Sequence, residues 1–378
     1  MEKIKILHLI ESLAMGGAER RLINDLKFMD NNRFSNTVCC VKKDSGLGKE
    51  VKSLGVKVFF LEEHATGHAG KLLYLLKYLI KNKIDILHSQ IFWADIYGRI
   101  AGKISGVKHV VSTIQGTPYS HGVPFLNSSK RKFLDGFTGR CFGSGFIAVS
   151  EYAKKSAVQN LRVNKELIEV VYNYIDFQCW QEVNKAAVDR FKKELRIAEE
   201  GFVLITVGRL DPPKGHRYVL EALPSIIEEE QNIKYLIIGD GPYRETLQSL
   251  TKELNIEQNV VFTGNRMDVK ELIYLSDIFI FPSLSEGLSV ALMEAMASGK
   301  PCIATSIPPN LEIIEDRLNG LTVPPEDSKS IKNAILFLMR SKTVREKISI
   351  EGQRTIKEKF SPKHNIKLLE EYYLKACN

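Results

Sequence analysis

The stretch DIFIFPSLSEGLSVALMEAMASGKPCIATS, residues 277–306, contains the pattern that decides the fold of this chain. An almost wholly apolar run (277–283) is followed by a segment with helical periodicity (288–298), and a second short apolar run begins at 301. Short strands of this composition are typical of parallel sheets, because helices cover both of their faces. The stretch therefore predicts a strand, a crossover helix and a second, parallel strand.

The same alternation of apolar runs and amphipathic segments continues along the rest of the chain. In the first half we expect strands at 4–10, 36–41, 56–61, 84–89, 108–113, 145–150 and 168–173. In the second half we expect them at 202–208, 233–239, 259–264, 277–283, 301–306 and 320–324. A polar stretch at about 174–200 separates the two series. The pattern predicts an α/β protein of two Rossmann-like, doubly wound domains whose loops face each other across a deep cleft.

Composition excludes several other classes of protein. A chain of 378 residues is too long for one ordinary core, and 44% hydrophobic with 26% charged residues is typical of a globular protein. No segment is apolar for long enough to span a membrane, and the first residues indicate a strand more than a signal peptide. The six scattered cysteines predict free, buried thiols. We therefore expect a cytoplasmic protein.

Charge is distributed unevenly between the two halves. Residues 1–180 contain 26 Lys and Arg against 16 Asp and Glu, whereas 181–378 contain 27 against 29. The basic half suits an anionic partner such as a membrane surface or a lipid phosphate. A solvated Lys-rich surface explains the charge equally well. The same two interpretations apply to SSKRKFLDGFTGRCF (128–142), which combines four cations with three phenylalanines.

A glycine pair follows the first expected strand. In ESLAMGGAER (11–20), Gly16 and Gly17 precede a helix, so backbone N–H groups can approach an anion without an intervening side chain. The full GxGxxG pattern of a dinucleotide site is absent. A simple tight turn remains an alternative.

A basic, proline-stiffened loop follows the first strand of the second half. In GRLDPPKG (208–215), Arg209 and Lys214 lie five residues apart, and we expect Lys214 at the start of a helix. Two cations fixed at the carboxyl end of a strand suit a diphosphate, although two solvated surface cations are the alternative. Two later turns carry weaker signals. GDGPYRE (239–245) suits a plain turn and a ligand contact equally well, and TGNRMDV (263–269) could present backbone groups to a nucleobase edge.

Two carboxylates flank the helix of the opening stretch. With a helix from Leu288, the N–H groups of Leu288, Ser289 and Val290 would be open to a phosphate, while Glu286 precedes the helix and Glu294 lies about two turns in. A carboxylate beside a phosphate repels it. The two glutamates are explained if they accept hydrogen bonds from the hydroxyls of a sugar and a ribose on either side of the phosphate. The alternative is a first-turn Glu that serves the helix dipole and a second, solvated one.

Together these motifs resemble a known family. GRLDPPKG, GDGP, FTG, the pair of glutamates separated by seven residues and NGLTVPPED resemble the retaining glycosyltransferases of family 4, which have the GT-B fold. MGGAER and VVYNYID extend the resemblance over the first half. It implies an acceptor-binding domain at 1–178, a nucleotide-sugar-binding domain at 179–360 and a last helix, 361–378, that crosses back to the first domain.

The resemblance also implies the roles of individual residues. Arg209 and Lys214 would neutralise the diphosphate, Glu286 would hold hydroxyls of the transferred sugar, and no metal would be required. These three residues are the expected catalytic set. The expected donor-binding residues are Gly16, Gly17, Gly208, Gly241, Asn265, Arg266, Leu288, Ser289, Val290 and Glu294.

The chain departs from the family pattern in two places. Gln115 stands where many relatives have a histidine, and Pro308 and Pro309 replace a glycine pair. We place Gln115, His121 and Asn173 at an acceptor or sugar pocket without assigning them individual roles. Both departures leave the donor preference open.

The function expected from the sequence is transfer of a sugar from a nucleotide diphosphate donor, most simply a UDP-sugar, to a glycan or lipid-linked acceptor. The pathway would be the synthesis of a surface or capsular polysaccharide, a lipopolysaccharide or a glycolipid, with peripheral contact of the basic domain at the inner face of the membrane. We expect no cofactor and no nucleic acid partner. The alternatives are a sugar-nucleotide epimerase or hydrolase on the same fold, or a non-catalytic nucleotide-sugar-binding subunit.

Overall fold

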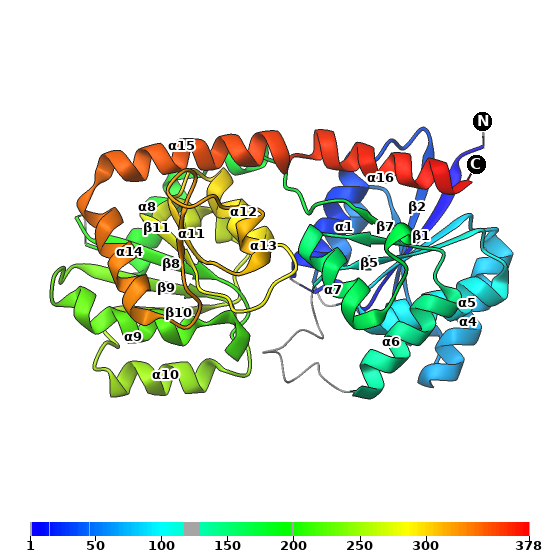
Figure 1. Ribbon diagram of the computed structural model, residues 1–378, viewed down its shortest axis with the longest axis horizontal. Helices are drawn as coiled ribbons and strands as arrows, with labels where there is room; N and C mark the ends of the chain where they lie inside the picture. The colour runs from blue at the N-terminus through cyan, green and yellow to red at the C-terminus, as the bar shows by residue number, and fades with distance from the viewer. Residues whose placement is uncertain (1, 15, 45, 117–128, 199, 378) are drawn as a thin grey trace. The chain divides into compact units, whose positions relative to one another are not determined.

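The computed structural model describes residues 2–14, 16–44, 46–116, 129–198 and 200–377 (Figure 1). It divides into two compact units. Unit 1 comprises Met1–Tyr174 with Pro362–Asn378, and unit 2 comprises Ile175–Ser361. The division falls four residues before the boundary expected at 178, and the final segment belongs to unit 1.

Unit 1 is built on a parallel sheet of seven strands in the order β3-β2-β1-β4-β5-β6-β7. The strands are β1 (Ile4–Ile10), β2 (Phe34–Cys40), β3 (Lys57–Phe60), β4 (Ile86–Gln90), β5 (His109–Ile114), β6 (Gly145–Ala148) and β7 (Ile168–Val170). The strand order reverses direction between β1 and β4. This reversal is the switch point of a doubly wound sheet.

Helices cover both faces of this sheet. They are α1 (Gly17–Phe28), α2 (Gly48–Ser53), α3 (Leu61–His64), α4 (Gly67–Asn82), α5 (Phe92–Ser105), α6 (Ser129–Phe142), α7 (Glu151–Leu161) and α16 (Pro362–Cys377). Alternate residues of a strand point to opposite faces. Leu7 and Leu9 accordingly pack in a core with α4 and α5, Ile10 packs with α1 and α2, and Ile6 packs with α16.

Unit 2 contains a parallel sheet of six strands in the order β10-β9-β8-β11-β12-β13. The strands are β8 (Phe202–Val207), β9 (Ile233–Ile238), β10 (Val260–Gly264), β11 (Ile278–Phe281), β12 (Cys302–Thr305) and β13 (Leu321–Val323). Its helices are α8 (Lys185–Glu194), α9 (His216–Ile227), α10 (Arg244–Glu253), α11 (Val269–Leu275), α12 (Val290–Ala297), α13 (Pro308–Leu311), α14 (Ser328–Arg340) and α15 (Lys342–Lys359). The switch point lies between β8 and β11.

The fold class predicted from the sequence is confirmed, since each expected apolar run contains a strand of one of the two parallel sheets. The prediction that the cysteines are buried is wrong for Cys141 and Cys179, which are exposed, because they lie on an outer helix face and in a short surface turn. Among the described residues, no helix is both long and apolar enough to cross a membrane.

The C-terminal helix α16 is fixed to unit 1 by a buried histidine. His88 on β4 has its Nδ1 within 2.5 Å of the hydroxyl of Tyr373 on α16, and its Nε2 lies 2.6 Å from the hydroxyl of Thr113 on β5. Burial lowers the pKa of His88 well below its usual range, so the ring is neutral. A neutral imidazole donates one hydrogen bond and accepts another. A hydroxyl group can do either, so Tyr373 and Thr113 can pair with both tautomers of His88.

We expect Tyr373→Phe to lower the free energy of unfolding of unit 1 by about 1–3 kcal/mol, because it leaves a buried ring nitrogen of His88 without a partner. The measurement is urea unfolding followed by Trp93 fluorescence in a Trp180→Phe background, so that the signal comes from unit 1. Tyr372→Phe, one residue earlier, is the control and should change stability little. An equal loss from both variants would show that the His88 contact does not fix the helix.

Candidate active site

The strongest candidate site lies at the carboxyl ends of β8 and β11 in unit 2. These strands are neighbours at the point where the strand order reverses. In doubly wound sheets, the loops that follow two such strands diverge, and ligands bind between them. The loop after β8 carries Arg209 and Lys214, and the loop after β11 carries Glu286.

An ion pair joins these two loops. The Nζ of Lys214 lies 2.6 Å from Oε1 of Glu286, with the lysine half-buried and the glutamate largely buried. Thus two residues that the sequence assigned to different parts of a ligand are in contact with each other. In this position Lys214 is held by a carboxylate, and any anion that binds there must compete with that carboxylate for the ammonium group.

Backbone contacts hold the loops at the distance that the ion pair needs. The N–H of Leu284 donates to the carbonyl of Pro213 at 2.7 Å, and the hydroxyl of Ser283 donates to the same oxygen at 3.2 Å. Gly215 has a left-handed φ of 69°, and a Cβ there would lie 2.0 Å from the carbonyl of Pro282. Only glycine fits both conditions.

The expectation that Lys214 begins a helix is wrong. Lys214 ends a 3-10 turn, Pro212–Lys214, and α9 begins two residues later at His216. The two prolines fix their own φ near the value of a 3-10 turn, and the left-handed Gly215 then prevents the turn from continuing into the helix. Lys214 therefore lies in a short, rigid turn.

Arg209 and His216 complete the loop after β8. The Nε of Arg209 lies 2.8 Å from Oδ2 of Asp211, and its side chain is exposed. His216 is buried, with Nε2 3.2 Å from the carbonyl of Arg209. Burial, with a smaller contribution from Lys214, lowers the pKa of His216 to about 4, so a neutral ring donates to that carbonyl and positions the loop. The sequence analysis missed His216.

The glycines of GDGP support this loop from the neighbouring strand. A Cβ on Gly239 would lie 2.0 Å from the carbonyl of Gly208, and one on Gly241 would lie 2.4 Å from the carbonyl of Leu210. Gly241 was predicted to bind the donor, but its lack of a side chain is explained by this backbone contact. A Cβ on Gly208 would meet nothing within 4 Å. Of Gly208, Gly239 and Gly241, only Gly208 has open space where a side chain would stand.

The helix of the opening stretch begins later than predicted. α12 starts at Val290, and Ser289 is its N-cap, with Oγ accepting from the N–H of Leu292 at 3.2 Å. The predicted helix start at Leu288 is therefore wrong, because Leu288 is a buried loop residue and Ser289 caps the helix. The contact of the Leu288, Ser289 and Val290 N–H groups with a phosphate stays a prediction. Val290 and Ala291 are the first two helical residues.

Glu294 lies one turn into α12, not two. The buried positions of this helix are all apolar, and Glu294 is its only charged residue. Glu294 is itself partly buried. The position of Glu294 on this otherwise apolar helix is compatible with the predicted contact to the ribose hydroxyls, which stays a prediction.

Asn265 and Arg266 follow β10 at the same edge of the sheet. Arg266 makes two bonds of 2.7 Å to the carboxylate of Asp268, contacts Glu194 at 3.3 Å and stacks on Phe191. These contacts hold the Arg266 side chain against α8. Asn265 is exposed, so only backbone groups and the Asn265 side chain remain for the predicted contact with a base.

In unit 1 the glycine pair lies beside a carboxyl group that the sequence analysis missed. Gly16 is the N-cap of α1 and Gly17 its first residue. The Oε2 of Glu19 lies 2.5 Å from the point where a Cβ of Gly16 would stand, so the absent side chain makes room for this carboxyl group. Burial, assisted by the charge of Glu11, raises the pKa of Glu19 to about 7.

Of the three residues predicted for an acceptor or sugar pocket, one lies at a strand end of unit 1. Gln115 follows β5, and its Nε2 donates to Oε1 of Gln90 at 2.8 Å. The next residue after Gln90, Ile91, has a φ of 74°, which is a strained conformation for a β-branched side chain. His121 lies outside the described residues.

Asn173 is not at an open surface. Its side chain is buried, and its Oδ1 accepts from Nη1 of Arg21 at 3.2 Å. Arg21 is also paired with Asp25, which accepts from the hydroxyl of Tyr174 at 2.7 Å. This network attaches the chain after β7 to α1, and we withdraw Asn173 from the acceptor pocket.

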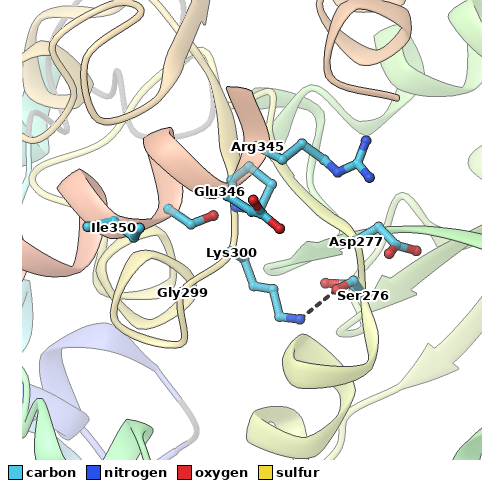
Figure 2. Close-up of a pocket in the computed structure, with 9 residues that line it drawn as sticks. Ser276, Asp277, Gly299, Lys300, Arg345, Glu346 and Ile350 are labelled. Atoms are coloured by element: carbon cyan, nitrogen blue, oxygen red, sulfur yellow. Dashed lines mark hydrogen bonds between the residues drawn. The ribbon is translucent and has the colours of Figure 1, made fainter. Parts of the chain in front are cut away.

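A separate cavity of about 380 Å³ lies at the other end of the unit 2 sheet, before β11 and β12 (Figure 2). Lys300 lines it and donates to the carbonyls of Tyr274 and Ser276 at 2.6 and 2.7 Å. Burial lowers the pKa of Lys300 to about 8. Because its ammonium group is engaged by backbone carbonyls, this lysine holds the turn before β11.

Within the described parts of the chain, no group of three or more His, Cys, Asp or Glu side chains is arranged to hold a metal ion. The positive charge at the switch point of unit 2 comes instead from Arg209 and Lys214. Two doubly wound units, with paired cations and carboxylates at the switch point of the second, suit a ligand that carries both phosphate and hydroxyl groups.

Comparison with known proteins identifies the family. Residues 187–355 match the model of the glycosyl transferases group 1, and residues 15–178 match the model of glycosyltransferase family 4. The chain belongs to the family 4 glycosyltransferases.

Curated relatives and solved structures agree with this assignment. The chain is 28% identical, over 90% of its length and 89% of the relative, to the UDP-Gal:alpha-D-GlcNAc-diphosphoundecaprenol alpha-1,3-galactosyltransferase of Escherichia coli. It is 29% identical, over 78% and 75%, to the N-acetyl-alpha-D-glucosaminyl L-malate synthase of Bacillus anthracis. Anabaena HepE in complex with UDP-glucose has the same fold, with a TM-score of 0.88, 22% identity and coverage of 98% and 99%.

Two glycines of unit 2 should respond differently to alanine. We expect Gly239→Ala to lower the free energy of unfolding by about 2–4 kcal/mol, because the new Cβ would overlap the carbonyl of Gly208 and φ is 131°. Gly208→Ala is the matched control and should leave stability unchanged or a few tenths of a kcal/mol higher. Urea unfolding followed by Trp180 fluorescence in a Trp93→Phe background would measure both, and equal effects would refute the packing role.

The stability of unit 1 should fall as Glu19 ionises. A carboxyl whose pKa is near 7 when folded and 4.5 when unfolded stabilises the fold below pH 4.5 and loses this contribution as the pH rises through 7. The gain in stability from Glu19→Gln should therefore be about 2 kcal/mol larger at pH 8 than at pH 5. Urea unfolding at both pH values tests this expectation, and a gain independent of pH would contradict it.

Proposed function

We propose that this glycosyltransferase transfers a sugar from a UDP-sugar to a lipid-linked or glycan acceptor, with retention at the anomeric carbon and without a metal ion. The observation that carries the proposal is the ion pair between Lys214 and Glu286 at the switch point of unit 2. It places an ammonium group for a diphosphate next to a carboxylate for hydroxyl groups, which are the two chemistries of a nucleotide sugar.

The first step of the proposed mechanism is exchange of partners in this ion pair. When the donor binds, its diphosphate takes the ammonium group of Lys214, and the Glu286 carboxylate is released to accept hydrogen bonds from hydroxyls of the transferred sugar. Arg209 is exposed and holds the Asp211 carboxylate through its Nε, so the terminal nitrogens of its guanidinium face solvent and can donate to the same diphosphate.

The second step is departure of the nucleotide diphosphate. Negative charge develops on the leaving group as the glycosidic bond breaks, and fixed cations stabilise this state more than the ground state. Lys214 and Arg209, with the first N–H groups of α12, supply this stabilisation, so the proposed reaction needs no metal. Glu294, one turn further along α12, would accept from the ribose hydroxyls.

The donor and acceptor classes rest on the relatives. The E. coli relative is named for a UDP-galactose donor and a diphosphoundecaprenol-linked acceptor, and HepE binds UDP-glucose. These names support a UDP-sugar and a lipid-linked acceptor for this chain, in the synthesis of a surface polysaccharide or glycolipid. The resemblance of the motifs to the retaining family 4 enzymes supports the proposal of retention.

A second candidate function is supported by Glu19. A sugar-nucleotide epimerase or hydrolase needs an acid or base in the first unit, and a buried carboxyl with a pKa near 7 is suited to that task. The two candidates differ in their need for an acceptor. Incubation of the wild-type protein with UDP-sugars alone, followed by chromatography of the products, distinguishes them, because rapid epimer formation or hydrolysis would refute transfer as the main reaction.

We expect Glu286→Gln and Lys214→Met to have different effects. Glu286→Gln should lower kcat by about 10²–10³-fold without weakening UDP binding, because the carboxylate acts on the sugar and its loss leaves Lys214 available to the diphosphate. Lys214→Met should weaken UDP binding by about 30-fold, the value of a charge-assisted contact of about 2 kcal/mol. Calorimetric titration of UDP and a transfer assay with the best donor from a thermal-shift screen measure these effects.

The control for these variants is Glu358→Gln, which alters an exposed ion pair with Arg354 on α15. It should change neither quantity. A Glu286→Gln variant with wild-type turnover would refute the role assigned to that carboxylate.

A further inference from the structure

Helix α6 has its apolar and polar sides reversed. Its buried residues are Asp135, Gly136, Thr138 and Gly139. Its outward residues include Phe133, which is 68% exposed, and Phe137, which is 42% exposed, and the two rings stack with their centroids 6.0 Å apart. A helix on the surface of a soluble domain normally does the opposite.

The inner side of α6 is explained by packing within unit 1. The guanidinium group of Arg99 on α5 is buried and contacts Asp135 at 2.6 Å. A Cβ on Gly139 would lie 3.3 Å from Val163, so the helix lies close against its neighbours. These contacts are satisfied by polar and small residues and require no phenylalanine on the opposite side of α6. The exposed rings therefore need another explanation.

The neighbouring helices α4 and α5 share this property. Helix α5 packs against both α4 and α6. Among the described residues of unit 1, the exposed large apolar side chains number six, and five of them are on these three helices. The five are Leu73, Ile80, Ile104, Phe133 and Phe137. We call the outward side of α4, α5 and α6 the α4–α6 face.

The charge of the α4–α6 face is of one sign. Leaving out the buried Arg99, the three helices contain eight Lys and Arg residues, three from α4, one from α5 and four from α6. Their only acidic residues are Asp95 and Asp135, and both are buried beside Arg99. The face thus presents apolar side chains and cations without any exposed carboxylate from these helices.

We propose that the α4–α6 face binds the surface of an anionic lipid bilayer. Phe133 and Phe137 would enter the region between headgroups and acyl chains, where aromatic rings are favoured, and the flanking cations Lys130 and Arg140 would contact lipid phosphates. A basic surface with several apolar side chains is what such a membrane attracts, and the two contributions add.

Charge favours a bilayer over a second copy of this chain. Two α4–α6 faces in contact would bring cations against cations, which is unfavourable for association. An anionic bilayer instead supplies both negative charge and an apolar layer. The proposal does not depend on the proposed glycosyl transfer, although a lipid-linked acceptor would lie in the same membrane.

The experiment is flotation of the full-length protein with vesicles of phosphatidylcholine containing 30% phosphatidylglycerol, compared with vesicles of phosphatidylcholine alone. No donor or acceptor is present, so the result is independent of enzymatic activity. We expect binding to the anionic vesicles that weakens with added salt. Phe133→Ser/Phe137→Ser and Lys130→Ser/Arg140→Ser should each lower the partition coefficient by about tenfold or more.

The matched control is Leu167→Ser, which removes the one exposed large apolar side chain of unit 1 that lies outside the α4–α6 face in the described part of the chain. It should bind as the wild type does. Circular dichroism and thermal unfolding check that each variant is folded, and Leu73→Ser/Ile80→Ser on α4 provides a second test if the α6 variants are not.

Three results would overturn the proposal. The first is no binding of the wild type to anionic vesicles at low ionic strength. The second is equal binding by the wild type and by folded variants of both α6 and α4. The third is a wild-type dimer in light scattering that becomes monomeric in Phe133→Ser/Phe137→Ser without any vesicle binding, which would make a second copy the occupant of the face.

Discussion

The contact between the loops that follow β8 and β11 is the constraint on which the candidate site depends. Parallel strands end at a common edge of the sheet, so these loops start side by side, but their backbones approach closely only where side chains are absent. Gly215 in the loop after β8 lies against Pro282 after β11, and Gly239, which follows β9, lies against Gly208 on the other side of the β8 loop. With the backbones in contact, Lys214 and Glu286 are brought to within 2.6 Å of each other, and Glu294 follows on a helix that is capped by Ser289. The positions of the charges are thus a consequence of glycine packing.

The ion pair also explains how the Glu286 carboxylate can be tolerated at an edge of the sheet that is suited to an anion. A free lysine at this position would attract any anion, and a free glutamate would repel the diphosphate of the donor. Paired with each other, the two groups leave little net charge in the absence of ligand. The free energy needed to separate a half-buried pair must then be supplied by two new partners, phosphate for the lysine and hydroxyls for the glutamate. A ligand with only one of these groups replaces only one partner, so the pair favours a ligand that contains both.

The sequence was sufficient for the fold because both sheets are parallel and buried on both faces, which makes every strand an apolar run. The sequence was less informative about the positions of the site residues. The start of α12 was placed at Leu288 because apolar periodicity extends through that residue, although Ser289 carries a capping signal that could have corrected it. His216 and Glu19 could not have been found in this way, since their burial and altered pKa values arise from contacts between segments. Asn173 was misplaced for the same reason, because its partner Arg21 is 152 residues away in the chain.

Helix α6 shows how a buried charge network can leave one side of a helix free for another purpose. Burying Arg99 with Asp135, and with Asp95 whose pKa burial raises to about 7, removes charged groups from water, so the network contributes little to net stability and mainly fixes the position of α6 against α5. Because these polar contacts and two glycines complete the inner side, the core gains nothing from apolar residues elsewhere on the helix. Phenylalanines at Phe133 and Phe137 lower solubility and are not explained by the packing of unit 1. Their presence, with cations and without exposed carboxylates on α4, α5 and α6, is therefore best explained by a surface outside the protein.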